Sequence, residues 1–433
     1  MKDGKRVGLA LSGGGYRAAA FHLGTMRKLH QLNILEKVDV FSTISGGSIT
    51  GAAYCMKDTD YPAFEKWMVG TLTKKSVIRY VLSSFAFLRT LLFLLVFLGG
   101  SVYVLFTPYP WASPILLIIM TILFFLFQYK LFPVSKVIEK AYDRYFFKSK
   151  TLSQLADHPA IAIGSTNIQT CRPFSFSKNR MGDSAYTYHK PPVIFKHREF
   201  PVSKAVMASS CVPFAFAPVL IESKYYQHPE QAAEFKPVLV DGGVYDNQGI
   251  HKLTESKSSY LCDIIISSDA GSKPPFKRSF NNVIILLIRT MDVFMARIKD
   301  FQIVTNVYRN TRSGTNREIT YVSLGWDLSR LIPGFVSNLA QGNIAPSVLA
   351  CHKIPEELLD NIQENQAAIR AYLETKLNYA AMEKDIVNEA DLLCARSVGT
   401  NLTKLSIRQV DCLSRHAANI TELQVKLYCP SLI

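Results

Sequence analysis

The sequence lacks several motifs that would assign a function directly. It has no GxxxxGK[ST] run, so a P-loop nucleotide site is excluded. None of its eight cysteines forms a CxxC pair, and no zinc-finger spacing occurs. We therefore expect no bound metal, and we interpret the cysteines as free thiols in a reducing compartment.

Acidic residues are scarce relative to basic ones. The 433 residues include 34 Asp and Glu against 49 Lys and Arg, which gives a formal net charge of +15. No RNP-like aromatic motif or dense basic block accompanies this charge, so we expect no nucleic-acid partner. An anionic membrane surface explains the excess, and so does an ordinary basic protein surface.

Charged side chains are missing altogether between Thr90 and Tyr129. Forty residues at about 1.5 Å each make roughly 60 Å of helix, which is two crossings of a ~30 Å hydrocarbon core. A proline-rich turn with aromatic residues lies in the middle, at 107–114. We predict an inserted transmembrane hairpin over 81–132, with helices near 81–106 and 113–132.

Basic residues flank this hairpin, whereas the turn between its helices has no charge. The positive-inside rule then places the rest of the chain on the cytoplasmic side of a membrane. A pair of buried soluble helices and a re-entrant hairpin are the alternatives. The flanking residues are Lys74, Lys75, Arg79 and Arg89 before the hairpin, and Lys130, Lys136 and Lys140 after it.

The rest of the chain is typical of an α/β protein. We predict one domain over 1–275, interrupted by 81–132, and a mostly helical C-terminal region over 276–433. Residues 278–310 are expected to form a long apolar helix, either packed in the core or lying on a membrane surface. Besides the two strands described below, strands are expected at Ala160–Ser165, Pro237–Val240 and Leu261–Ser267.

An apolar strand over 7–11 leads into a run of three glycines, Gly13, Gly14 and Gly15. Consecutive glycines suit a loop whose N–H groups point at an oxyanion, because side chains would block that approach. Arg17 follows; it either steadies the loop, attracts an anionic substrate or is a surface arginine.

The same glycines also fit a loose GxGxxA dinucleotide fingerprint. Glu36 or Asp39 would then bind the ribose. A dinucleotide-dependent oxidoreductase is thus an alternative, although it leaves the next two motifs unexplained.

Ser45 lies where a nucleophile elbow would place its serine, between a strand over 38–44 and a helix expected at Gly47–Met56. Gly46 and Gly47 relieve crowding around a strained serine. Thr43 takes the place of the first glycine in the usual GxSxG pattern. The rival serines are Ser42 and Ser48.

A third motif is a strand that ends on Asp241, followed by Gly242 and Gly243. The carboxylate is expected at the same sheet edge as Ser45, although a lone DGG is often only a turn. No histidine has an equally convincing setting, so we favour a two-residue Ser-Asp device over a triad. The histidines considered are His22, His30 and His251.

Together these motifs resemble those of the patatin-like phospholipases. The resemblance covers roughly residues 6–75 and 155–250, in the family order. Its other matches are Thr166-Asn167 and the block Ser203-Lys204-Ala205-Val206-Met207-Ala208-Ser209-Ser210-Cys211-Val212-Pro213-Phe214.

The resemblance implies a three-layer α/β/α acyl hydrolase without a metal or other cofactor. Ser45 would be the nucleophile, Asp241 the base, and Gly13, Gly14 and Gly15 the oxyanion hole. Arg17 and Gly46 would support them, Gly46 as a further N–H donor.

We therefore expect a membrane-anchored phospholipase A or lysophospholipase that forms an acyl-enzyme from membrane phospholipid. The alternative is a non-enzymatic protein of the same fold that binds lipid or a partner.

Overall fold

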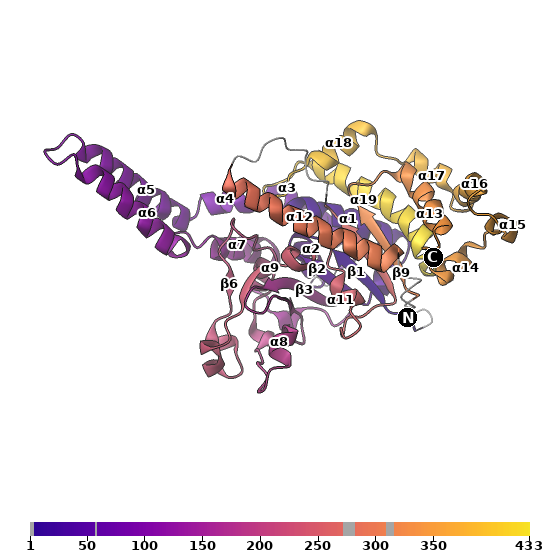
Figure 1. The fold of residues 1–433 in the computed structure, drawn as a ribbon, viewed down its shortest axis with the longest axis horizontal. Coiled ribbons are helices and arrows are strands. Elements are labelled where there is room, and N and C mark those ends of the chain that lie inside the picture. Colours follow the sequence, from indigo (N-terminus) through magenta and orange to yellow (C-terminus); the bar gives the residue numbers. More distant parts are fainter. Residues whose placement is uncertain (1–3, 57–58, 272–281, 309–315) are drawn as a thin grey trace.

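In the computed structural model, which describes residues 4–56, 59–271, 282–308 and 316–433, nine strands form one mixed sheet within those residues (Figure 1). The main path has the order β5-β4-β3-β2-β1-β8-β9, and β7 and β6 extend it from β3. The parallel strands are β1 (Val7–Leu11), β2 (Val40–Ile44), β3 (Ala160–Asn167), β8 (Ile264–Asp269) and β9 (Glu318–Ser323). The antiparallel strands are β4 (Arg172–Phe176), β5 (Met181–Gly182), β6 (Val219–Leu220) and β7 (Val238–Asp241).

The register of the central strands sets where the motifs meet. Leu11 at the end of β1 lies opposite Thr43 on β2 and Ser268 on β8. Strand β7 runs antiparallel to β3, with Asp241 opposite Ser165. The end of β7 therefore reaches the edge at which β1 and β2 also end. The predicted strands are present; β1 matches its predicted bounds, and the ends of the others differ by at most three residues.

Helices cover both faces of the sheet, because each central strand is buried on both sides. Leu9 and Leu11 point into a large core, whereas Ala10 points into a smaller one. The expected three-layer α/β/α fold is confirmed. The larger core holds residues of α1 (Gly15–Gln31), α2 (Gly46–Tyr54), α3 (Tyr61–Lys74), α7 (Val134–Tyr142), α9 (Val202–Ser209) and α19 (Ile407–Tyr428). The smaller core is covered by α11 (His251–Thr254) and the end of α12 (Val283–Ile303).

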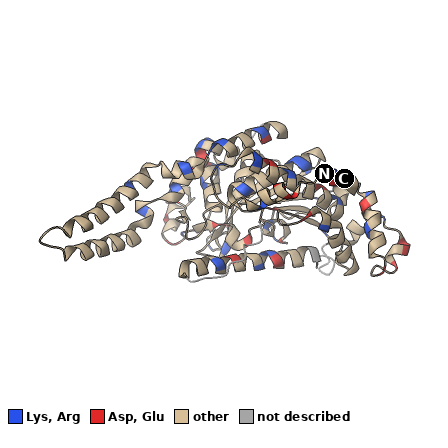
Figure 2. Ribbon diagram, turned by 90° about the horizontal axis from the view of Figure 1, so that it is seen from above, with Lys and Arg blue, Asp and Glu red and all other residues tan. Residues whose placement is uncertain are grey.

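Two antiparallel apolar helices project from this body as a hairpin (Figure 1). They are α5 (Phe85–Val104) and α6 (Ala112–Leu131), joined to the body through α4 (Val77–Leu82) and α7. Each is long and apolar enough to cross a membrane, by length and composition, with mean hydropathy of 2.1 and 2.3. Figure 2 shows no charge along the hairpin beyond its base, as expected from the sequence.

Polar contacts join the two hairpin helices at both ends. At the base, Arg89 donates to the carbonyl oxygens of Lys130 and Leu131, which have no N–H partner within α6, and the Thr90 hydroxyl also donates to that of Leu131. Near the tip, the hydroxyls of Ser101 and Ser113 lie 2.7 Å apart. The pairing of α5 with α6 is therefore fixed independently of any contact with the body.

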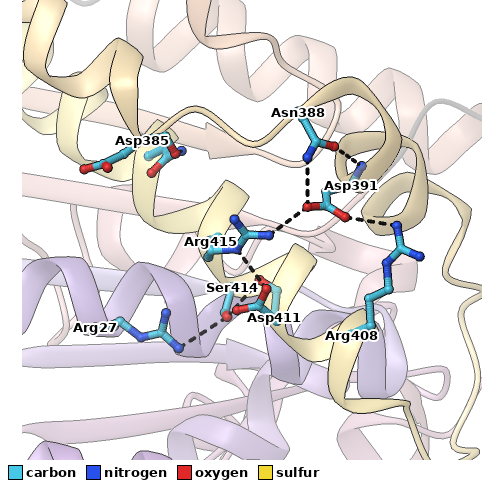
Figure 3. A network of polar contacts seen from close by, with 9 residues as sticks. Arg27, Asp385, Asn388, Asp391, Arg408, Asp411, Ser414 and Arg415 are labelled. Carbon is cyan, nitrogen blue, oxygen red and sulfur yellow. Dashed lines mark hydrogen bonds and ion pairs between the residues drawn. The ribbon is translucent and has the colours of Figure 1, made fainter.

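The region expected to be mostly helical from residue 276 also supplies the edge strand β9. Its last long helix, α19, packs along α1 over the sheet. Figure 3 shows how α18 (Glu389–Ser397) is tied to α19: Asp391 accepts hydrogen bonds from Arg408 and Arg415. The domain boundary near 275 remains a prediction, and the sheet itself continues beyond it.

Shorter helices complete the described chain. Those near the sheet are α8 (Ser184–Thr187) and α10 (Gly243–Asp246). Those of the C-terminal region are α13 (Leu331–Ala340), α14 (Pro346–His352), α15 (Glu356–Leu359), α16 (Gln366–Lys376) and α17 (Tyr379–Lys384). The long helix expected over 278–310 is α12; positions 278–281 and 309–310 of that prediction lie outside the described residues.

The crossing of α1 and α19 generates a stability prediction. A Cβ at Gly24 would lie 2.0 Å from the carbonyl oxygen of Ser414, so the helices must separate to admit it. We expect Gly24→Ala to lower the free energy of unfolding by about 1–3 kcal/mol. Gly334→Ala is the matched control, because no atom lies within 4 Å of its added Cβ. Thermal unfolding measures both variants, and equal melting temperatures would contradict the close crossing.

Candidate active site

Ser45 lies at a strained turn between β2 and α2. Its backbone has φ of 50° and ψ of −116°, outside the regions that non-glycine residues ordinarily adopt. Its N–H donates to the Ser209 hydroxyl at 2.9 Å, which helps to hold the turn. The departure from GxSxG at Thr43 is accommodated by Gly51, because a Cβ there would lie 2.6 Å from the Thr43 methyl group.

The helix after Ser45 approaches β1 and the glycine run at backbone distance. A Cβ at Gly46 would lie 2.2 Å from the Gly15 carbonyl oxygen, and one at Gly47 would lie 2.3 Å from that of Leu11. Both positions therefore require glycine. As expected, the two glycines relieve crowding at this turn. They do so by letting the main chain of α2 approach the main chain of β1 and of the glycine run.

Asp241 meets Ser45 at this sheet edge. The Ser45 side chain hydrogen-bonds to the Asp241 carboxylate, whose Oδ1 also accepts the N–H of Gly243 at 2.7 Å. Burial raises the pKa of Asp241 to about 6, and the two hydrogen bonds oppose that rise. Ser45 and Asp241 are each only 7% exposed. The structure thus joins a strained serine to a carboxylate of raised basicity.

The three loop glycines do not all offer their N–H groups in the same way. Gly13 donates its N–H to the carbonyl of Asn247 at 3.0 Å, so the expectation that it faces an oxyanion is not met in this conformation. Gly14 and Gly15 have φ of 144° and 60°. Within the described residues, no protein acceptor pairs with the N–H of Gly14, Gly15 or Gly46.

The side chain of Arg17 is buried, so the interpretation as a surface arginine is wrong. Its guanidinium donates to the carbonyl of Val398 at 3.2 Å and lies beside Gly14. Burial lowers its pKa, and the Asp269 carboxylate opposes that effect. Arg17 thus connects the glycine loop to the C-terminal region, as the expectation of a steadying residue required.

None of the hydrogen bonds that the structure records for Ser45 or Asp241 involves a histidine. His22 is buried and bonded to Ser268 and the Ser12 carbonyl, and burial lowers its pKa to about 4. His30 pairs with Glu36, and His251 pairs with Glu255, the residue that follows α11. The geometry therefore joins two residues and forms no triad.

The rival assignments are accounted for by other contacts. Ser48 donates to Thr43 at 3.0 Å and lies 2.9 Å from the Ser209 hydroxyl, so it braces the turn. Ser42 is buried within β2. Asp39 precedes β2 and accepts the N–H of Val7, at the strand end opposite to the one where a ribose acid lies.

Sequence reasoning missed three residues that hold the site. Ser209 fixes the turn at Ser45, and Asn247 binds the Gly13 N–H. Asn401 accepts the N–H of Tyr16, and its main chain abuts Gly15, where an added Cβ would lie 2.4 Å from the Asn401 oxygen. Ser209 lies inside the block from Ser203 to Phe214, and Asn247 follows Gly243 by four residues. Asn401 carries no local signal, because its role depends on a contact distant in sequence.

The described residues contain no group of three or more His, Cys, Asp or Glu side chains that could hold a metal ion. The arrangement at the sheet edge combines instead the hydroxyl of a strained serine, a buried carboxylate and three N–H groups without a protein acceptor among the described residues. Such a set can carry out nucleophilic attack on a carbonyl and stabilise the resulting oxyanion.

Comparison with solved structures gives distant similarities. Human GIVD cytosolic phospholipase A2 shares 16% identity over 61% of this chain and 43% of its own, with a TM-score of 0.39. Its complex with methyl gamma-linolenyl fluorophosphonate and terbium chloride shares 13% identity over 99% of this chain and 60% of its own, with a TM-score of 0.46. VipD from Legionella pneumophila shares 13% identity over 99% of this chain and 88% of its own, with a TM-score of 0.34. The chain thus spans less than half of the first of these proteins, and no curated protein matches it.

The sequence family is clear. Residues 9–254, which are 246 of the 433, match the family described as patatin-like phospholipase. This range includes the glycine run, the turn at Ser45 and the strand that ends on Asp241. The chain therefore belongs to the patatin-like phospholipase family, a membership that supports lipid acyl hydrolase activity.

Proposed function

We propose that this protein is a membrane-anchored acyl hydrolase, of phospholipase A or lysophospholipase type, that uses Ser45 and Asp241 as a catalytic dyad. The observation that carries the proposal is the hydrogen bond between the strained Ser45 and the buried Asp241. A serine hydroxyl needs an adjacent base to become a useful nucleophile, and this is the base within its reach. Membership of a phospholipase family supports a lipid ester as the substrate.

In the first half of the reaction, the Ser45 hydroxyl oxygen attacks the ester carbonyl carbon while Asp241 accepts its proton. The carbonyl oxygen becomes an oxyanion, which accepts hydrogen bonds from the N–H groups of Gly14 and Gly15. Gly46, at the N-terminus of α2, is the further donor, and the helix dipole there favours negative charge. The alcohol leaves with the proton from Asp241, and the acyl group remains on Ser45.

In the second half, water attacks the acyl-enzyme. Asp241 removes one proton from that water, the second oxyanion occupies the same N–H groups, and the bond to Ser45 breaks as Ser45 regains a proton. The fatty acid is released. The raised pKa of Asp241 suits both halves, because a carboxylate with a pKa of about 6 is ionised at neutral pH yet more basic than an exposed one.

The membrane anchor in this proposal is the hairpin of α5 and α6. Twenty residues each give about 30 Å of helix, which matches the hydrocarbon core of a bilayer. Their apolar side chains are largely exposed, which would be unfavourable in water. Basic residues at the base support a cytoplasmic location of the catalytic body over 1–275, with the hairpin inserted at 81–132.

The nucleophile is tested by Ser45→Ala. We expect this variant to lose fatty-acid release and fluorophosphonate labelling by several orders of magnitude, because the covalent intermediate can no longer form. Mass spectrometry of the products and a labelling gel measure both effects. Ser48→Ala is the comparison variant: it loses one brace of the turn but keeps the Ser45 hydroxyl, so it should retain fluorophosphonate labelling. If labelling is lost in the Ser48 variant and retained in the Ser45 variant, the nucleophile is Ser48.

The base is tested by Asp241→Asn. We expect turnover to fall by orders of magnitude with little change in melting temperature, since the amide keeps the shape but is not a base. In the unmodified protein, kcat/KM should rise with pH through about 6 and then level off, because only the ionised Asp241 accepts the proton. A well-folded Asp241→Asn protein with near-normal turnover would direct the search to His251.

The anchor is tested by extraction. The full chain should stay with membranes in carbonate or high salt, because hydrophobic insertion is not screened by ions. Deletion of residues 81–132 should yield a more soluble protein that still hydrolyses short, water-soluble esters. Release of the intact chain by salt alone would show that charge, not insertion, holds it on the membrane.

A further inference from the structure

Helix α12 exposes an unusually apolar end. Its first six residues, Val283 to Ile288, have the sequence VIILLI, and all are exposed, from 43% at Ile285 to 72% at Val283. Six residues make more than one full turn, so no side of this segment is buried against the body. A contiguous exposed apolar patch of this kind marks an interaction surface.

The second half of α12 is fixed beside the candidate active site. The methyl group of Met295 lies 3.3 Å from where a Cβ at Gly243 would be, in the turn that follows Asp241. Farther along, Lys299 pairs with the buried Asp269 at 2.5 Å, and Ile303 packs against the smaller core. The exposed end of α12 is thus held in place by the anchored end of the same helix.

The exposed end of α12 lies on the side of the body from which the hairpin projects. In Figure 1 the first turns of α12 point toward the end of the body from which the hairpin projects, and in Figure 2 the hairpin extends beyond that same end. Arg89 and Lys130 mark the base of the hairpin, and Arg289 directly follows the apolar end of α12. Apolar helix ends bordered by cations match a bilayer whose headgroups are anionic.

We propose that the first turns of α12, Val283–Ile288, insert into the lipid leaflet that the hairpin enters at its base, and that α12 guides an acyl chain from that leaflet toward Ser45. The first part is a docking surface for a lipid bilayer; the second rests on the proposed function. From Val283 to Met295 the helix rises about 18 Å. It therefore connects the membrane-proximal end of the body with the turn beside Asp241.

The test compares two variants, each with one added tryptophan, at opposite ends of the molecule. The full-length Ile284→Trp protein is reconstituted into vesicles of phosphatidylcholine and phosphatidylglycerol, with or without bromine on the acyl chains. The control is Ile433→Trp, an exposed apolar position at the C-terminus, away from the hairpin (Figure 1). Signal from the three native tryptophans is subtracted with the parent protein. We expect brominated lipid to quench the added fluorescence of the Ile284→Trp protein at least twofold more than that of the control.

A second measurement asks whether the docked end serves catalysis. The double variant Ile284→Asp and Leu287→Asp should release fatty acid from these vesicles about tenfold more slowly, because two apolar side chains no longer enter the lipid. Leu393→Asp, on the exposed surface of α18, should keep the parent rate.

The outcomes separate this inference from the proposed function. Equal quenching at the two positions, in a parent protein that hydrolyses a short soluble ester, overturns the docking surface and leaves the hydrolase intact. Selective quenching in a parent protein that hydrolyses neither soluble ester nor vesicle lipid supports the docking surface and overturns the hydrolase. An unchanged rate in the double variant overturns the guiding role of α12.

Discussion

The site depends on main-chain contact between two segments that have no side chains to separate them. Gly46 lies against Gly15 so closely that a Cβ would meet the opposing carbonyl oxygen at 2.2 Å. This approach sets the first turn of α2 against the glycine loop and places Ser45 between them. The strain at Ser45 and the N–H groups of the loop that lack a protein acceptor within the described chain lie at this approach, whereas the pairing of β7 with β3 places Asp241 beside them. Stability is sacrificed locally, and the buried cores on both faces of the sheet compensate.

Much of this arrangement could be predicted because its signals are local. Strands β1 and β2 are continuous apolar runs that end in small residues, and such runs identify buried strands with turns after them. The strand before Asp241 carries the same signal. The sequence predicts Asp241 at the edge where β2 ends, and Ser45 and Asp241 do meet there, although by a different route: β7 is antiparallel and pairs with the end of β3 that extends beyond β2.

The features that the sequence did not indicate depend on contacts between residues that are distant in the chain. The Gly13 N–H faces the Asn247 carbonyl, and nothing near Gly13 indicates this. Strand β9 lies in a region whose neighbours are helical, and its place at the sheet edge follows from pairing with β8. For α12, six successive apolar residues are compatible with a buried helix or an exposed one, and only the fold reveals which. Hydrophobic content alone does not distinguish a segment buried in the core from an apolar segment exposed on the surface.

The contact of Asn401 with the glycine loop bears on the order in which the protein becomes complete. Ser45 and Asp241 leave the ribosome well before Asn401, whose carbonyl accepts the Tyr16 N–H and whose main chain rests on Gly15. Val398, the partner of Arg17, arrives equally late. A chain still in synthesis therefore contains Ser45 and Asp241 before the residues that hold the glycine loop in place. The contacts that complete the site therefore come from a part of the chain that is synthesised long after the hairpin of α5 and α6.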